Sequence, residues 1–85
     1  MSAGVLDGRR ILVTGGTGGI GTAICRALHR DGARLAIHYG SSGDQAAALA
    51  AEEPSGSVAL QADLMSPTGP DELWDAASAA LGGID

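Results

Sequence analysis

A glycine-rich segment constrains the fold of this chain more than any other feature, since residues 14–21 read Thr-Gly-Gly-Thr-Gly-Gly-Ile-Gly. A short apolar run rich in branched side chains, residues 10–14, precedes it and predicts a buried strand. The segment is followed by apolar residues at the spacing of one helix stripe. The sequence therefore predicts a strand, a tight turn and a helix in succession, with glycines that let another molecule approach the backbone closely. The stripe consists of Ile20, Ala23, Ile24, Ala27 and Leu28.

The remainder of the chain continues this alternation of strand and helix. Apolar runs predict strands over residues 34–39 and 57–62. Helical composition and spacing predict helices over residues 46–53 and 70–81. Residues 84–85 resemble the start of one more strand.

Residues at the ends of the expected helices support these assignments. Gly32 suits the left-handed C-terminal cap of the first helix. Ser42 and Gln45 have the spacing of a capping box before the second. Pro70, followed by two acidic residues, suits the first turn of the third, and Gly82 closes that helix. The apolar face expected for the third helix consists of Leu73, Trp74, Ala77, Ala80 and Leu81.

The order of elements, β-α-β-α-β-α with short connections, predicts an α/β fold with a parallel sheet and helices on both faces. This pattern is half of a Rossmann-type doubly wound sheet, with strand order 3-2-1. A fourth strand would lie on the far side of the first. We therefore expect residues 1–85 to be a partial NAD(P)-binding Rossmann domain that lacks the fourth strand and everything after it.

Composition excludes several classes of partner. The 85 residues have a net charge of -5, and their five cations are all Arg, so we expect no concentrated basic surface for nucleic acid. No apolar stretch is long enough to span a membrane. The single cysteine, Cys25, excludes an intramolecular disulfide, and the start of the chain lacks the pattern of a secretion signal, so we expect a cytoplasmic protein. Cys25 and His29 are one helical turn apart without further ligands nearby, and we expect no metal site.

The turn between the first strand and the first helix is the candidate functional site. A helix start offers free N–H groups and a partial positive charge to an anion such as a pyrophosphate. The pattern Gly-x-Gly-x-x-Gly, from Gly16 to Gly21, is weak alone but strong between a strand and a helix. A flexible glycine-rich loop is the alternative. A nucleoside triphosphate P-loop is excluded, because its pattern requires a Lys and this chain has none.

With these residues the chain resembles the short-chain dehydrogenase/reductase family, whose pattern Thr-Gly-x-x-x-Gly-x-Gly is matched by Thr14, Gly15, Gly19 and Gly21. The lead-in, residues 6–10, is similar to the classical branch and its β-ketoacyl carrier-protein reductases. The glycine pattern of the extended branch, typical of sugar-nucleotide epimerases, matches equally well. Extended members usually carry an acidic residue at the end of the second strand, which this chain lacks, so we favour the classical branch.

The end of the second strand also bears on the cofactor. An acidic residue there would bind the ribose 2′-OH of NAD, but Asp31 precedes the strand and Asp44 lies in the next helix. The resemblance implies instead that the hydroxyls of Tyr39, Ser41 and Ser42 bind the 2′-phosphate of NADP. Relatives often carry Arg at the positions of Gly18 and Gly40, and this chain has no cation at either. We expect NADP rather than NAD, while helix capping is the alternative role for Ser42.

The family resemblance implies that Asp63, followed by Leu64, binds the adenine amino group. The alternative is a carboxylate that ends a strand and starts a turn. The cofactor-binding residues predicted from the sequence are Gly15, Thr17, Gly18, Gly19, Ile20, Gly21, Tyr39, Ser41, Ser42, Asp63 and Leu64.

The resemblance implies reduction of a carbonyl or oxidation of an alcohol by hydride transfer, with a catalytic Ser, Tyr and Lys. None of these can be placed here, because the chain has no Lys and its one Tyr, Tyr39, belongs to the adenosine end. His38 is expected to be an ordinary polar strand residue rather than a general base. We therefore expect the cofactor-binding N-terminal part of an NADP-dependent reductase that forms a homo-oligomer at full length. An inactive dinucleotide-binding or interaction module is the alternative.

Overall fold

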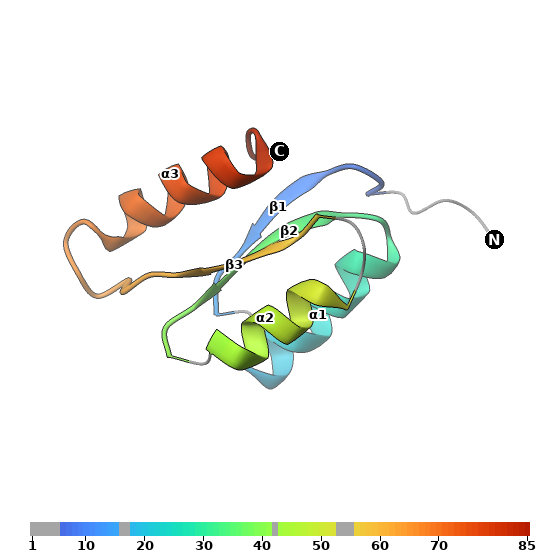
Figure 1. Ribbon diagram of the computed structural model, residues 1–85, viewed down its shortest axis with the longest axis horizontal. Coiled ribbons are helices and arrows are strands. Elements are labelled where there is room, and N and C mark those ends of the chain that lie inside the picture. The colour runs from blue at the N-terminus through green and yellow to red at the C-terminus, as the bar shows by residue number, and fades with distance from the viewer. Residues whose placement is uncertain (1–5, 16–17, 42, 53–55) are drawn as a thin grey trace.

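The computed structural model describes residues 6–15, 18–41, 43–52 and 56–85. Strands and helices alternate along the chain, as the sequence predicts. Figure 1 shows a three-layer arrangement, with two helices against one face of the sheet and the third against the other. The elements are β1 (Arg10–Val13), α1 (Gly19–Arg30), β2 (Arg34–Tyr39), α2 (Gly43–Ala51), β3 (Val58–Gln61) and α3 (Gly69–Leu81).

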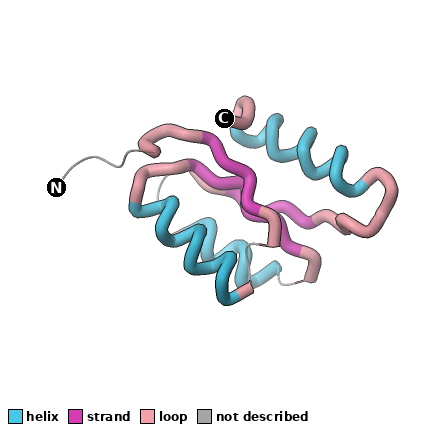
Figure 2. Tube along the Cα trace, turned by 180° about the vertical axis from the view of Figure 1, so that it is seen from behind, coloured by secondary structure: helices cyan, strands magenta, loops and turns pink. Residues whose placement is uncertain are grey.

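The three strands are parallel and lie in the order β1-β2-β3, which is the expected 3-2-1 order read from the other edge. Leu12 pairs with Ala36 between β1 and β2, and Ile37 pairs with Ala59 between β2 and β3. Each strand reaches the next through a helical crossover, so all three carboxyl ends lie at one edge of the sheet. The view from behind in Figure 2 shows α1 and α2 on the face opposite α3. The predicted half of a doubly wound fold is confirmed.

β2 is the centre of the core, because helices cover it on both faces. Leu35 and Ile37 point toward α1 and α2, where they pack with Cys25 and Leu49. Ala36 points the other way and packs against α3. A strand buried on both faces needs an uninterrupted apolar run, which explains the composition of β2.

The face that α1 turns toward the sheet differs from the expected one. The buried residues of α1 are Cys25 and His29, whereas Ile20 is 81% exposed and Ile24 is 46% exposed. The His29 Nε2 lies 2.8 Å from the Ser57 hydroxyl oxygen, which also accepts the N–H of Leu35 at 2.9 Å. Cys25 and His29 thus form the inner face of α1, and most of the apolar stripe faces outward. The expectation that the stripe covers the sheet is therefore wrong for its exposed members, Ile20, Ala23, Ile24 and Ala27.

Only part of the apolar face predicted for α3 is buried. Leu73, Ala77 and Leu81 repeat every four residues and pack on the sheet. Trp74 is 52% exposed and Ala80 is exposed, so their assignment to the core was wrong. The described sheet has three strands, so a narrow stripe of α3 is enough to cover the face that the sheet turns toward this helix.

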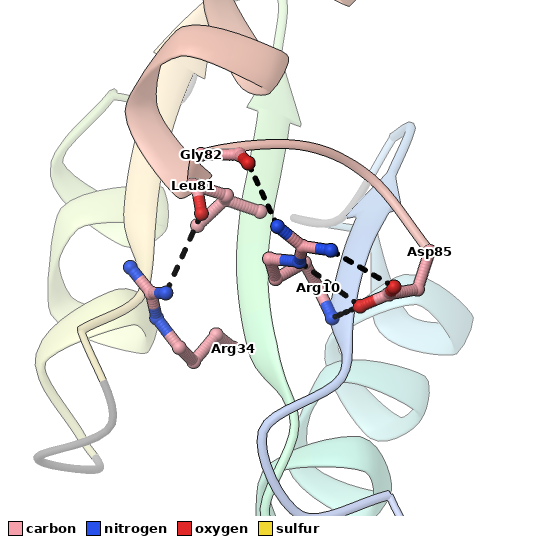
Figure 3. A network of polar contacts seen from close by, with 5 residues as sticks. All are labelled: Arg10, Arg34, Leu81, Gly82 and Asp85. Atoms are coloured by element: carbon pink, nitrogen blue, oxygen red, sulfur yellow. Dashed lines mark hydrogen bonds and ion pairs between the residues drawn. The ribbon is translucent and has the colours of Figure 1, made fainter.

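An ion pair joins the end of the chain to the start of β1 (Figure 3). The guanidinium of Arg10 donates to both carboxylate oxygens of Asp85 at 3.0 Å, and its Nη1 donates to the Gly82 carbonyl at 2.7 Å. The N–H of Asp85 donates to the Arg10 carbonyl at 2.8 Å, on the edge of β1 away from β2. Residues 84–85 are not a strand, but this bond is where a strand beside β1 would begin. None of the described helices is both long and apolar enough to cross a membrane.

Candidate functional site

The start of α1 presents backbone donors to solvent. The first bond within the helix runs from the Thr22 N–H to the Gly18 carbonyl at 2.8 Å. The N–H groups of Gly19, Ile20 and Gly21 precede it and have no acceptor in the helix. Gly18, at the N-cap position, has no side chain that could cap them, and no acidic residue lies in the first turn. Three donors and the positive end of the helix dipole therefore converge at an exposed position, an arrangement that suits an anion.

The glycines around these donors leave room for a ligand. A Cβ at Gly19 would meet no atom of the chain within 4 Å, and at Gly18 the nearest would be the Gly15 carbonyl oxygen at 3.9 Å. Packing within the protein does not require glycine at Gly19. The missing side chain instead keeps a path open to the N–H groups, which is the fit that a bulky phosphate needs.

Gly15, which the sequence also assigns to the site, lies in the turn before the helix. Gly15 adopts φ +64°, which favours glycine, and its N–H donates to the Nδ1 of His38 at 3.0 Å. It therefore shapes the turn while its own donor is used within the protein. Gly16 and Thr17 lie outside the described residues.

The end of β2 lies beside the start of α2. The Tyr39 ring covers Gly43 so closely that a Cβ there would be 3.2 Å from Cε2 and 3.3 Å from the hydroxyl oxygen. Ser41 is exposed and lines a hollow with Gly43, Asp44 and Gln45. The sequence argument set Asp44 aside, but this residue lines the hollow, where its negative charge would oppose a second one. Ser42 lies outside the described residues.

The end of β3 is a tight polar turn. The Oδ1 of Asp63 accepts the Met65 N–H at 2.9 Å, and the Asp63 carbonyl accepts the Ser66 N–H at 3.1 Å. Gly69 packs directly against the Asp63 carbonyl, so that any side chain there would collide with it. Leu64 is partly exposed beside this turn. Asp63 thus has the turn-forming role given above as the alternative, and the residue is exposed.

His38 ties the three strand ends together, and the sequence argument missed it. The side chain is 6% exposed. Its Nδ1 accepts from Gly15 at the end of β1, and its Nε2 donates to the Ala62 carbonyl at 2.9 Å, after β3. The signal available in the sequence was a single imidazole within an apolar strand run.

Cys25 and the Arg26–Glu52 pair lie outside this edge of the sheet. Burial raises the pKa of the Cys25 thiol, which keeps it neutral. The Arg26 guanidinium donates to both Glu52 oxygens, at 3.0 and 2.8 Å, and this bonding lowers the pKa of Glu52. That pair crosses the groove between α1 and α2, so the groove has no uncompensated charge from these residues. The described residues contain no cluster of three His, Cys, Asp or Glu side chains that could hold a metal.

The family model for short chain dehydrogenases matches residues 9–85. The chain belongs to the short chain dehydrogenase family. Short chain dehydrogenase/reductase nsrJ of Aspergillus novofumigatus is 39% identical over an alignment 85 residues long, which covers 96% of this chain and 32% of the relative.

Two solved structures share the fold of this protein. One is a short chain dehydrogenase from Burkholderia cenocepacia in complex with NADP, 40% identical, with a TM-score of 0.82 over 94% of this chain and 34% of that one. The other is a blue fluorescent protein from a metagenomic library in complex with NADPH, 40% identical, with a TM-score of 0.83 and the same coverage. The chain thus spans about a third of the length of the relatives it matches. The predicted family is confirmed, and the classical branch stays a prediction.

Proposed function

We propose that this chain binds NADP(H) as the cofactor-binding part of an oxidoreductase. The uncapped start of α1 carries the proposal, because the N–H groups of Gly19, Ile20 and Gly21 suit a pyrophosphate. Open space at Gly19 supports it. The two solved relatives described above hold NADP and NADPH, which favours the same cofactor here.

The hollow at the start of α2 is the proposed position of the ribose 2′-phosphate. Ser41 lines it, and we assign Ser42 and the Tyr39 hydroxyl to the same subsite. No acidic residue stands in β2 or directly after it, so the usual ligand of the NAD ribose is lacking. Asp44 opposes the phosphate and makes the preference for NADP smaller than these hydroxyls alone would give.

The turn after β3 is the proposed adenine subsite. Asp63 Oδ1 is held by the Met65 N–H, which orients the carboxylate and leaves Oδ2 to accept from the adenine amino group. Leu64 supplies an apolar contact for the base. The structural and binding roles of Asp63 are compatible, because each uses a different oxygen.

The proposed reaction is reduction of a carbonyl or oxidation of an alcohol, and the bound nicotinamide supplies or accepts the hydride. The residues of this chain bind and orient the adenosine and pyrophosphate parts. The proton donor and the substrate contacts are assigned to the part of the relatives that this chain does not span. A cytoplasmic homo-oligomer with a small carbonyl or alcohol substrate completes the proposal, and the comparisons give no support to an inactive module.

Calorimetric titration of the chain with NADPH and with NADH tests this function. NADPH should bind more tightly, and Tyr39→Asp should shift the preference toward NADH, because a carboxylate repels the 2′-phosphate. Asp44→Asn should tighten NADPH about two- to fivefold and leave NADH unchanged. Asp75→Asn, the same charge change on an exposed position of α3, is the matched control. Equal or tighter binding of NADH by the unmutated chain would contradict the proposal.

A further inference from the structure

We propose that His38 is a positioning residue that sets the orientation of the pyrophosphate-binding turn and of the adenine turn together. The proposal rests on the NADP(H)-binding function given above. His38 lies in β2 between the two turns. None of its described hydrogen bonds goes to the start of α1 or to Asp63. Its influence would pass through Gly15 on one side and Ala62 on the other.

The two partners of the imidazole define its protonation. The N–H of Gly15 can only donate, so Nδ1 must accept. The carbonyl of Ala62 can only accept, so Nε2 must carry the proton. A neutral imidazole with its proton on Nε2 satisfies both bonds and leaves no ring nitrogen unused, at a site where an unpaired polar group would be costly.

The bond to Gly15 reaches the anion-binding donors in three steps. It fixes the direction of the Gly15 peptide at a position with φ +64°. The Gly15 carbonyl accepts the Gly18 N–H at 3.4 Å, and the Gly18 carbonyl accepts the Thr22 N–H at 2.8 Å. His38 therefore holds the turn that aims the first N–H groups of α1, and it keeps the Gly15 donor turned away from the anion.

The bond to Ala62 acts on the other subsite. Ala62 directly precedes Asp63, whose carboxylate begins the turn at Met65. The N–H of Ala62 also donates to the Tyr39 carbonyl at 3.2 Å, so the residue is held from both sides of its backbone. One buried side chain thus couples two loops, one 23 residues before it at Gly15 and the other 24 residues after it at Ala62.

Three substitutions separate the two bonds. In His38→Asn, the side-chain oxygen is bonded to Cγ as Nδ1 is, so it can still accept from Gly15 but cannot reach Ala62. In His38→Gln, the longer amide can donate to Ala62 but is not placed for Gly15. His38→Leu removes both bonds. A purely structural role predicts that affinity follows the loss of stability in each variant, whichever bond is kept.

The experiment is a calorimetric NADPH titration of the unmutated chain and the three variants, with melting temperatures and the amide NMR spectrum of each. We expect His38→Asn and His38→Gln each to bind about three- to tenfold more weakly than the unmutated chain, because each variant loses one of the two bonds, and His38→Leu at least tenfold more weakly. The Gly15 amide proton should stay protected from exchange in the Asn variant alone. The Asn and Gln variants decide the matter if the Leu variant does not fold.

Three results would overturn the proposal in distinguishable ways. If the unmutated chain binds NADPH and either the Asn or the Gln variant binds it as tightly, His38 does not position both turns. If affinity only follows melting temperature, its role is structural. If the folded, unmutated chain does not bind NADPH, the proposed function itself fails and this inference fails with it.

Discussion

The substitution Gly19→Ala should weaken NADP(H) binding without weakening the fold. A Cβ at this position meets no atom of the chain within 4 Å, so the protein accommodates it. Alanine is also the better helix former, by about 1 kcal/mol in a helix interior, so stability should be unchanged or slightly higher. The added methyl group would occupy the open space through which a phosphate reaches the N–H groups of Gly19 and Ile20.

The expected loss follows from the donors that the methyl group obstructs. A hydrogen bond to a charged group contributes about 1.5–3 kcal/mol. Since about 1.4 kcal/mol corresponds to a tenfold change in affinity, loss of one such bond predicts a dissociation constant for NADPH raised about tenfold to one hundredfold. Affinity and stability should therefore move independently or in opposite directions.

Calorimetry with NADPH and a thermal melt of the same sample measure both quantities. Ala23→Val is the matched control, because it adds methyl groups to an exposed position one turn further along α1. It should leave the affinity unchanged. Binding by Gly19→Ala within about threefold of the unmutated chain would refute the reasoning, and so would an affinity loss that merely accompanies unfolding.

Three further predictions concern the turn after β3, the ion pair and the division of chemistry. Gly69→Ala forces a methyl group against the Asp63 carbonyl and should destabilise the chain by about 1–3 kcal/mol in denaturant unfolding. Gly40→Ala is the control, because a Cβ there meets no atom within 4 Å, and equal stability of the two variants would contradict the packing. Arg10 lowers the pKa of Asp85 from 3.8 to about 2, so the pair stabilises the fold above about pH 4 and this contribution disappears as the pH falls to about 2. The difference in melting temperature between the unmutated chain and Asp85→Asn should narrow over that interval, and a constant difference would argue against the pair. The 85-residue chain should oxidise no NADPH with a panel of ketones and β-ketoacyl thioesters, and turnover abolished by Gly19→Ala would disprove the assignment of the proton donor to another part of the protein.

The alternation of elements could be predicted because each boundary has a local cause. Apolar runs define the strands, and Gly32 and Gly82 end helices with φ values of +89° and +79°, which favour glycine. Pro70 and the acids after it lie in the first turn of α3, as predicted. These signals act over a few residues and do not depend on the neighbours in the fold.

The errors concern which side of an element is covered. Periodicity shows that Ile20 and Ile24 share one face of α1, but the face that meets the sheet carries Cys25 and His29. Periodicity also does not show how wide the buried face of α3 is. Trp74 directly follows the buried Leu73 and already lies outside the contact with the sheet. Arg10 and Asp85 are 75 residues apart, and nothing local connects them.

The order of strand, turn and helix around the candidate site was predicted, but the hydrogen bonds among its residues were not. The glycine pattern locates the start of α1, because strand, turn and helix must follow in that order for it to have meaning. The Gly15 N–H donates to His38, and Asp44 lies beside Ser41. Both contacts depend on how the ends of the parallel strands meet. Such contacts join segments that the sequence separates.

The central claim is that the N–H groups at the start of α1 bind the pyrophosphate of NADP(H), and an NMR titration of the amide signals tests it most directly. On addition of NADPH, the largest shifts should fall on Gly19, Ile20 and Gly21, with smaller ones at Ser41 and Asp63. NADH should reproduce the shifts in α1 and largely spare Ser41. Absence of shifts at the start of α1, or shifts at Arg26, Ala48 and Glu52 further along the groove with Gly19 unshifted, would contradict the account.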